Sequence, residues 1–218
     1  MLVHKSFPSV FGLMLIVSLA CTQYALPGGG AYSSPQPSAI GTPALTSIEA
    51  VTPVMPPAAI FARDDQLLQG RTQDVFKLLG FTPALPTVLL SSSRAQPEIT
   101  AYFPKDQPPT LELVYSSESP GVFVISIRET SSPSPIQYLA GAQTSDVAGT
   151  TVQHLIDAAP GGSRFSAIWE RGEISYYLEI YWSSILSGTA RDEGRQSGLR
   201  IIASFRPYQD LTLSPSSS

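Results

Sequence analysis

The chain has 218 residues, a formal net charge of −4, 14% charged side chains and 20 prolines. A mildly acidic chain without a basic run argues against nucleic acid as a partner, because surfaces that bind phosphates are rich in Lys and Arg. The one cysteine, Cys21, excludes a disulfide framework and, once it is modified, any thiolate metal site or thiol chemistry.

The first twenty residues have the pattern of a secretory signal peptide. Lys5 places a positive charge near the N-terminus, and residues 10–17 form a continuous apolar segment. This segment is too short to cross a membrane, since about 20 apolar residues are needed to span ~30 Å of hydrocarbon. Small Ala20 precedes the expected cleavage point and Cys21 follows it. We therefore expect residues 1–20 to be removed on export.

Residues 17–21 read Val-Ser-Leu-Ala-Cys and resemble the lipobox of bacterial lipoproteins. In that family the cysteine carries diacylglycerol and becomes the new N-terminus, so the resemblance implies that Cys21 is a lipid anchor in the cell envelope. Ser18 departs from the commoner Leu at its position. Stable anchoring needs two or more acyl chains, at about 0.8 kcal/mol for each buried CH2 group, which a lipidated cysteine provides. The alternative is an ordinary secretory signal followed by an incidental cysteine.

Residues 21–62 are expected to be the lipidated cysteine followed by a disordered tether. Residues 22–62 contain seven Pro and four Gly, which is 11 of 41, and no apolar periodicity that could offset the entropy of ordering. A flexible coil of this length spans roughly 35 Å. We expect a folded domain over residues 63–211 and a second disordered segment over residues 212–218.

The folded domain begins with helical patterns. We expect a first helical turn at residues 64–68, capped by an Asp, and a helix over residues 73–79. Thr72 is its expected N-cap and Gly80 its C-terminal stop.

After residue 86 the apolar pattern changes to the alternation of strands. Six strands are expected, at residues 98–103, 110–115, 121–128, 150–156, 164–170 and 174–182. The second and third form a hairpin, and the third reads as a central strand. A last helix is expected over residues 198–205, before Pro207. These elements predict an α+β fold, with an antiparallel sheet of about six strands and two or three short helices on one face.

The order of short motifs is similar to that of an uncharacterised extracytoplasmic domain of bacteria. The motifs, over residues 74–206, are Leu-Gly-Phe at 79–81, Leu-Pro at 85–86, Val-Ala-Gly-Thr at 147–150, Ile-Trp-Glu at 168–170 and Ile-Ile-Ala-Ser-Phe at 201–205. That domain is often attached to membrane-bound anti-sigma factors or lipoproteins. The resemblance implies an envelope location and supplies no catalytic residue.

His154 is the one histidine expected to remain after export. It could form an acid–base pair with Asp157 or Asp146, but no serine nucleophile with an elbow motif accompanies it. We therefore expect His154 to be a half-exposed strand residue and predict no catalytic residue.

The remaining polar clusters are interpreted as turns. Glu170, Glu173 and Glu179 are the densest carboxylates, and the first two flank a Gly172 turn where solvated side chains are normal. Residues 161–163, Gly-Gly-Ser, lack the Lys of a phosphate-binding loop. We expect no metal site and no cofactor.

The aromatic segment 174–182 is the most distinctive feature of the domain. If it is a strand, its residues alternate between two faces. One face is expected to be core, and Tyr177, Glu179 and Tyr181 form the other, as a candidate binding face for a sugar ring or a protein. The alternative is ordinary sheet surface, where Tyr is common.

Together these features predict a membrane-anchored extracytoplasmic lipoprotein. Its domain is expected to bind an unknown envelope protein or ligand without catalysis, and a sensory accessory role is one form of this expectation. The alternative is a lipid or lipoprotein carrier that encloses an acyl chain in a curved antiparallel sheet, and a third is a hydrolase that uses His154.

Overall fold

A computed structural model describes residues 45–63, 66–131 and 139–209 of the chain. All of them belong to one compact unit, Gly41–Ser218. The expected signal peptide, Cys21, the first half of the expected tether and the 212–218 segment lie outside the described residues.

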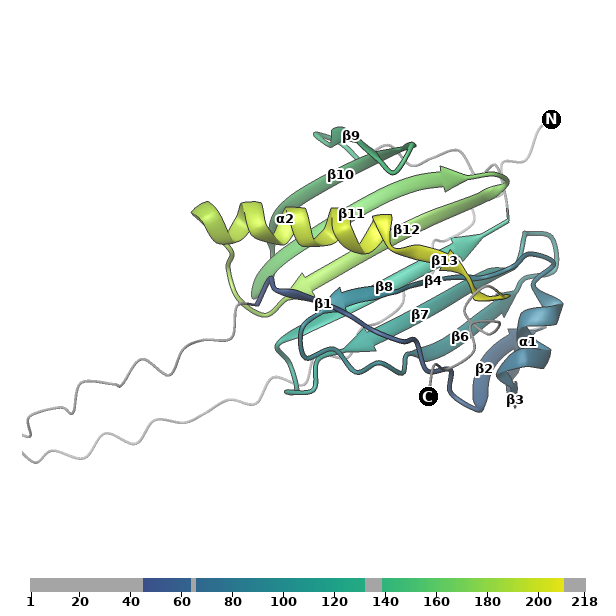
Figure 1. The fold of residues 1–218 in the computed structure, drawn as a ribbon. Helices are drawn as coiled ribbons and strands as arrows, with labels where there is room; N and C mark the ends of the chain where they lie inside the picture. The colour runs from purple at the N-terminus through teal and green to yellow at the C-terminus, as the bar shows by residue number, and fades with distance from the viewer. Residues whose placement is uncertain (1–44, 64–65, 132–138, 210–218) are drawn as a thin grey trace, which may run out of the picture. The chain divides into compact units, whose positions relative to one another are not determined.

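The domain is built on a sheet of nine strands in the order β3-β2-β6-β7-β8-β12-β11-β10-β9 (Figure 1). Neighbouring strands are antiparallel except β2 and β6, which are parallel. The strands are β2 Ala58–Arg63, β3 Gln66–Arg71, β6 Glu98–Phe103, β7 Thr110–Ser116, β8 Phe123–Thr130, β9 Gln143–Val147, β10 Thr150–Ala159, β11 Gly162–Arg171 and β12 Ile174–Trp182. β8 is the middle strand, which confirms its expected central place.

One face of this sheet, the covered face, packs against the remaining elements. Helix α2 (Gly188–Ala203) lies across β10 and β11, and helix α1 (Thr72–Leu78) packs beside β2 and β3 (Figure 1). Two small sheets complete the layer, β1 (Ile48–Ala50) with β5 (Val88–Leu90) and β4 (Ala84–Pro86) with β13 (Phe205–Pro207). The core between the layers is filled by large side chains that are less than 2% exposed, among them Trp169, Trp182, Tyr115, Phe165 and Phe205.

The opposite face, the open face, carries the side chains that alternate with the core. Along β7, and along β12 from Ser175 onward, buried residues alternate with half-buried ones, and along β8 they alternate with half-buried or exposed ones. A sheet with one face packed and the other solvated is normal for antiparallel strands. The expected α+β class therefore holds in its broad form, although the domain is mainly β.

The expected tether is wrong for residues 45–62, which belong to the domain. Residues 48–50 and 58–63 are strands β1 and β2. The indole N–H of Trp182 donates to the carbonyl of Leu45 at 3.0 Å, and the Ser197 hydroxyl donates to the carbonyl of Thr46. Prolines favour an extended backbone, and here the extended segment pairs with other strands, which composition alone does not reveal.

The helical turn expected at residues 64–68 is also wrong where the structure describes it, because residues 66–71 are strand β3. β3 forms an antiparallel pair with β2, and this pairing overrides the weak local helical signal. The helix at residues 73–79 is confirmed as α1, within one residue at each end. Arg71, not Thr72, is its N-cap residue, and the Thr72 hydroxyl donates to the carbonyl of Pro56. Gly80 has a φ of +74°, as expected of a C-terminal stop.

The six expected strands are all present, as β6, β7, β8, β10, β11 and β12, but six is too few. The other strands are short or lie at an edge, such as the polar edge strand β9. The last helix begins at Gly188, ten residues before the expected start at 198. The first ten residues of this helix were not predicted because glycine disfavours a helix and the segment contains Gly188 and Gly194. A Cβ at Gly198 would lie 2.5 Å from the Phe165 ring, and one at Gly194 would lie 2.9 Å from Leu186, so close packing of the helix selects these residues.

No helix among the described residues combines the length and the apolar character needed to cross a membrane.

Candidate functional site

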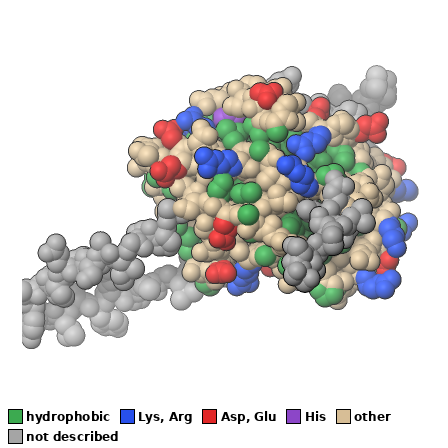
Figure 2. All heavy atoms as spheres, in the orientation of Figure 1, with side chains coloured by type: hydrophobic (Ala, Val, Ile, Leu, Met, Phe, Trp, Pro, Cys, Tyr) green, Lys and Arg blue, Asp and Glu red, His purple; other side chains and the backbone are tan. Residues whose placement is uncertain are grey.

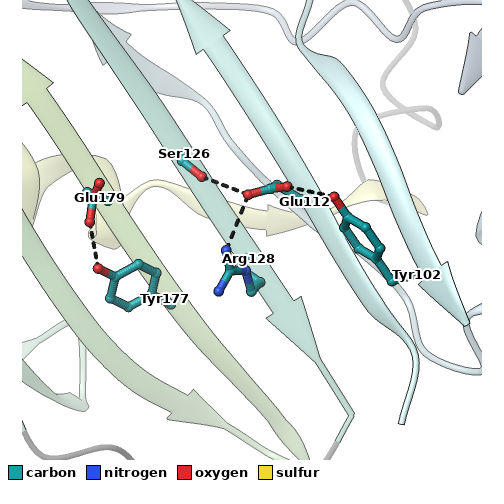
Figure 3. A network of polar contacts seen from close by, with 6 residues as sticks. All are labelled: Tyr102, Glu112, Ser126, Arg128, Tyr177 and Glu179. Carbon is teal, nitrogen blue, oxygen red and sulfur yellow. Dashed lines mark hydrogen bonds and ion pairs between the residues drawn. The ribbon is translucent and has the colours of Figure 1, made fainter. Parts of the chain in front are cut away.

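The open face carries a network of polar contacts that crosses three neighbouring strands (Figure 3). The carboxylate of Glu112 on β7 is its centre. It accepts hydrogen bonds from Tyr102 Oη on β6 at 3.3 Å and from Ser126 Oγ on β8 at 3.3 Å. Arg128 Nη2, also on β8, lies 3.4 Å from Glu112 Oε1. The cross-strand register places these residues together, since Glu112 pairs with Arg128.

Arg128 links this network to the predicted face on β12. Its guanidinium carbon lies 6.0 Å from the centre of the Tyr177 ring, in cation–π contact. Tyr177 Oη donates to Glu179 Oε2 at 2.7 Å. Burial, and the Glu179 carboxylate after it, raise the pKa of Tyr177, so its phenol stays protonated at neutral pH.

Tyr181 lies on the same side of β12, nearer its C-terminal end. Its hydroxyl donates to the carbonyl of Pro160 at 2.8 Å, in the turn between β10 and β11. Its neighbour across the strands, Arg164, makes two contacts with Asp157, at 3.3 Å and 2.9 Å. The structure therefore brings the three predicted residues to one face and holds each in place.

These contacts determine what the open face can do. Surface ion pairs contribute only ~0–1 kcal/mol to stability, so the network matters less for folding than for side-chain order. Tyr and Arg side chains that are already fixed lose little conformational entropy when a partner binds. The arrangement suits recognition.

His154 is buried, which corrects the expectation that it is half-exposed. Only 2% of the residue is exposed, because it points to the covered face and stacks on Phe165, with ring centres 6.0 Å apart. Its Nε2 lies 2.9 Å from Ser145 Oγ, and its Nδ1 has no hydrogen-bond partner among the described residues. Burial, and Arg195 after it, lower the pKa of His154.

The two carboxylates considered as partners of His154 lie elsewhere. Asp157 is paired with Arg164 on the open face, and Asp146 accepts a hydrogen bond from the Gly149 N–H at 3.1 Å in a turn. Ser145 and His154 form a serine–histidine contact, but no described carboxylate orients the ring as a catalytic triad requires.

Glu170 and Glu173 are exposed beside the Gly172 turn, as expected. The turn expected at residues 161–163 is wrong for residues 162–163, which begin strand β11, and the turn itself is formed by Pro160 and Gly161. Within the described ranges, no group of three or more His, Cys, Asp or Glu side chains could hold a metal ion.

Glu129 is a buried carboxyl group that the sequence analysis missed. It is fully buried on the covered face of β8, and the backbone N–H of Ala84 lies 3.3 Å and 3.1 Å from its two carboxyl oxygens. Burial raises its pKa to about 8, against the opposing effect of the Ala84 N–H. The strand's alternation signals this position, since Phe123, Ile125 and Ile127 precede it on the same face.

Comparisons with known proteins do not indicate a function for this chain. No protein-family description matches the sequence, and no curated protein matches it. A crystal structure of a protein from Bacteroides thetaiotaomicron VPI-5482 is similar over 54% of this chain and 42% of that chain, with 9% sequence identity and a TM-score of 0.33. The chain thus corresponds to less than half of that protein's length, and we draw no conclusion from a likeness of this size.

Proposed function

We propose that the protein is a lipid-anchored binding protein of the bacterial cell envelope and that it acts without catalysis. The lipobox-like segment ending at Cys21 supports the anchor. The similarity of residues 74–206 to domains found beside anti-sigma factors and on lipoproteins supports an extracytoplasmic, sensory accessory role.

The observation that carries the binding role is the ordered network on the open face. Tyr102, Glu112, Arg128, Tyr177 and Glu179 are linked by described contacts across four strands (Figure 3). Tyr and Arg are the residues most often responsible for binding energy at protein interfaces.

The proposed partner is a protein rather than a sugar. Sugars stack on free aromatic faces, whereas the guanidinium of Arg128 already covers one face of the Tyr177 ring. A protein surface can instead extend over the whole network and replace its water contacts.

The charge of the open face indicates the charge of that partner. From β6 to β9 in the sheet order, its side chains include six carboxylates and two guanidiniums. They are Glu98, Glu112, Asp146, Asp157, Glu170 and Glu179 against Arg128 and Arg164. Complementary charge speeds encounter and excludes wrong partners, so the proposed partner presents a positively charged surface.

The packing of the covered face favours this role over that of a lipid carrier. A carrier needs an apolar cavity of several hundred Å3. Here the large side chains of Trp169, Trp182, Phe165 and Tyr115 fill the centre of the core, and each is at most 1% exposed.

Site-specific cross-linking tests the binding face. Val124 lies on the open face and is 38% exposed, so p-benzoylphenylalanine at this position in the native host is expected to yield discrete protein adducts. Arg128→Ala combined with Tyr177→Ala is expected to lower their yield by about thirtyfold or more, because anchors of this kind contribute about 2 kcal/mol or more.

The matched control carries the same cross-linker at Gln196, which is exposed on α2 at the other side of the sheet. It is expected to yield none of these adducts. Equal adducts from both positions, or none from Val124, would contradict the proposed face. A carbohydrate adduct would contradict the choice of a protein partner.

A further inference from the structure

A second polar cluster lies on the covered side of the domain, away from the open face. A cavity of about 400 Å3 opens between the edge strand β9, its neighbour β10 and the N-terminal half of α2. Gln143, His154, Ile156, Arg191, Asp192 and Arg195 line it. Figure 2 views the molecule from the α2 side and shows basic side chains gathered near a histidine. The volume is within the range of sites for small molecules.

The charge of this cavity is opposite to that of the chain. Arg191 and Arg195 contribute two positive charges and Asp192 one negative charge, and His154 is neutral because its pKa is lowered. The whole chain carries a net charge of −4. Arg191 lies at the end of the first turn of α2, where the helix dipole disfavours a cation. An anion bound in the cavity would offset both the excess positive charge and the unfavourable interaction with the helix dipole.

Arg191 and Arg195 are held in place by hydrogen bonds that use only some of their N–H donors. Arg191 Nη2 donates to the carbonyl of Ile156, and Arg195 Nη1 donates to Gln143 Oε1 at 3.0 Å. Arg195 Nη2 also contacts Asp192. A guanidinium has five N–H donors, and the described contacts use one from Arg191 and two from Arg195. The remaining donors suit a planar or tetrahedral oxyanion.

The floor of the cavity contains a polar group that the domain does not satisfy. His154 is 2% exposed, and its Nδ1 has no hydrogen-bond partner in the described part of the chain. Buried polar atoms without partners are uncommon in folded proteins and are often found where a ligand or catalysis requires them. His154 itself lines the cavity, beside the two arginines.

We propose that this cavity binds a small organic molecule through a carboxylate or phosphate group held by Arg191 and Arg195, with His154 at its floor. The site is separate from the proposed partner-binding face, so the two can fail independently.

Binding is tested with two probes on the full chain at low ionic strength. Glucuronate presents a carboxylate and inorganic phosphate presents the other oxyanion, while glucose is the neutral counterpart of glucuronate. Two-dimensional NMR follows the His154 imidazole and the arginine Nε–H signals during each titration. We expect saturable shifts of both groups with at least one anionic probe and no saturable shift with glucose. The probe that binds identifies the chemistry of the ligand's acidic group.

Arg195→Gln is expected to weaken this binding about tenfold, and Arg200→Gln, on the same helix outside the cavity, is expected to leave it unchanged. Arg191→Gln, at an exposed residue, serves as the second cavity variant if Arg195→Gln does not fold. The absence of saturable shifts with both anions would overturn the proposal, as would wild-type affinity in the folded cavity variants.

Discussion

The free energy of unfolding is expected to fall as the pH rises from about 5 to 8, and Glu129→Gln is expected to remove most of this fall. The pKa of Glu129 is raised from 4.5 to about 8 by burial. A carboxyl group with a raised pKa in the folded state stabilises the fold fully below its unfolded pKa. This contribution is lost as the pH rises through the folded value.

The slope of this loss is about 1.4 kcal/mol for each pH unit between the two pKa values. Over 8 − 4.5 = 3.5 units the total reaches about 5 kcal/mol as an upper bound. The geometry explains the raised pKa of Glu129. Its carboxyl group is fully buried, and its described hydrogen-bond donor is the N–H of Ala84. Glutamine keeps the shape and an acceptor for that N–H and does not ionise.

Urea unfolding at pH 5, 6, 7 and 8 measures the effect. Glu173→Gln, at an exposed turn residue, is the control and should keep the wild-type slope. Comparison with Glu129→Gln cancels the contribution of the other titrating groups. Equal pH slopes for the wild type and Glu129→Gln would show that Glu129 ionises without cost in the folded state.

Gly162→Ala is expected to destabilise the domain more than any other glycine-to-alanine change in the described strands. A Cβ at Gly162 would lie 1.8 Å from the carbonyl oxygen of Trp182 and 2.9 Å from its carbonyl carbon. Both atoms belong to the backbone, so no side-chain rotation relieves the overlap. Overpacking normally costs about 1–3 kcal/mol, and we expect about 3 kcal/mol or more here because strand β12 itself must move.

Gly172→Ala is the matched control, in the turn between β11 and β12. Gly172 has a φ of +64° and a Cβ there would meet no atom within 4 Å, so its cost is limited to the left-handed backbone, about 1–2 kcal/mol. Thermal and urea unfolding of the two variants compare them directly. A Gly162→Ala variant as stable as Gly172→Ala would mean that β11 and β12 pack less closely at Gly162 than described.

The alternation of β12 shows how far sequence reasoning reaches. Its period of two separates Tyr177, Glu179 and Tyr181 from the core residues, and the observed burial agrees. The β-branched, apolar composition of residues 121–128 identified β8 as a central strand. Successive side chains of a strand point to opposite faces of the sheet. The alternation of apolar and polar residues within one strand is therefore enough to predict which of its side chains share a face.

The contacts between side chains on that face could not be predicted in the same way. Glu112, Arg128 and Tyr177 lie on three strands, and their contacts depend on the register between strands, which a single sequence does not fix. The cavity beside α2 was missed because the helix begins with glycine and polar residues. His154 was expected to be half-exposed because nothing in its own strand indicates that α2 covers it.

Intact mass spectrometry of the protein purified from its native membrane tests the central claim, that a lipid holds this binding domain in the envelope. The account predicts a species that begins at Cys21 and carries at least a diacylglycerol group. It also predicts that Cys21→Ala releases the protein from the membrane fraction. A wild-type species without lipid, or a Cys21→Ala protein that stays with the membrane, would contradict the anchor.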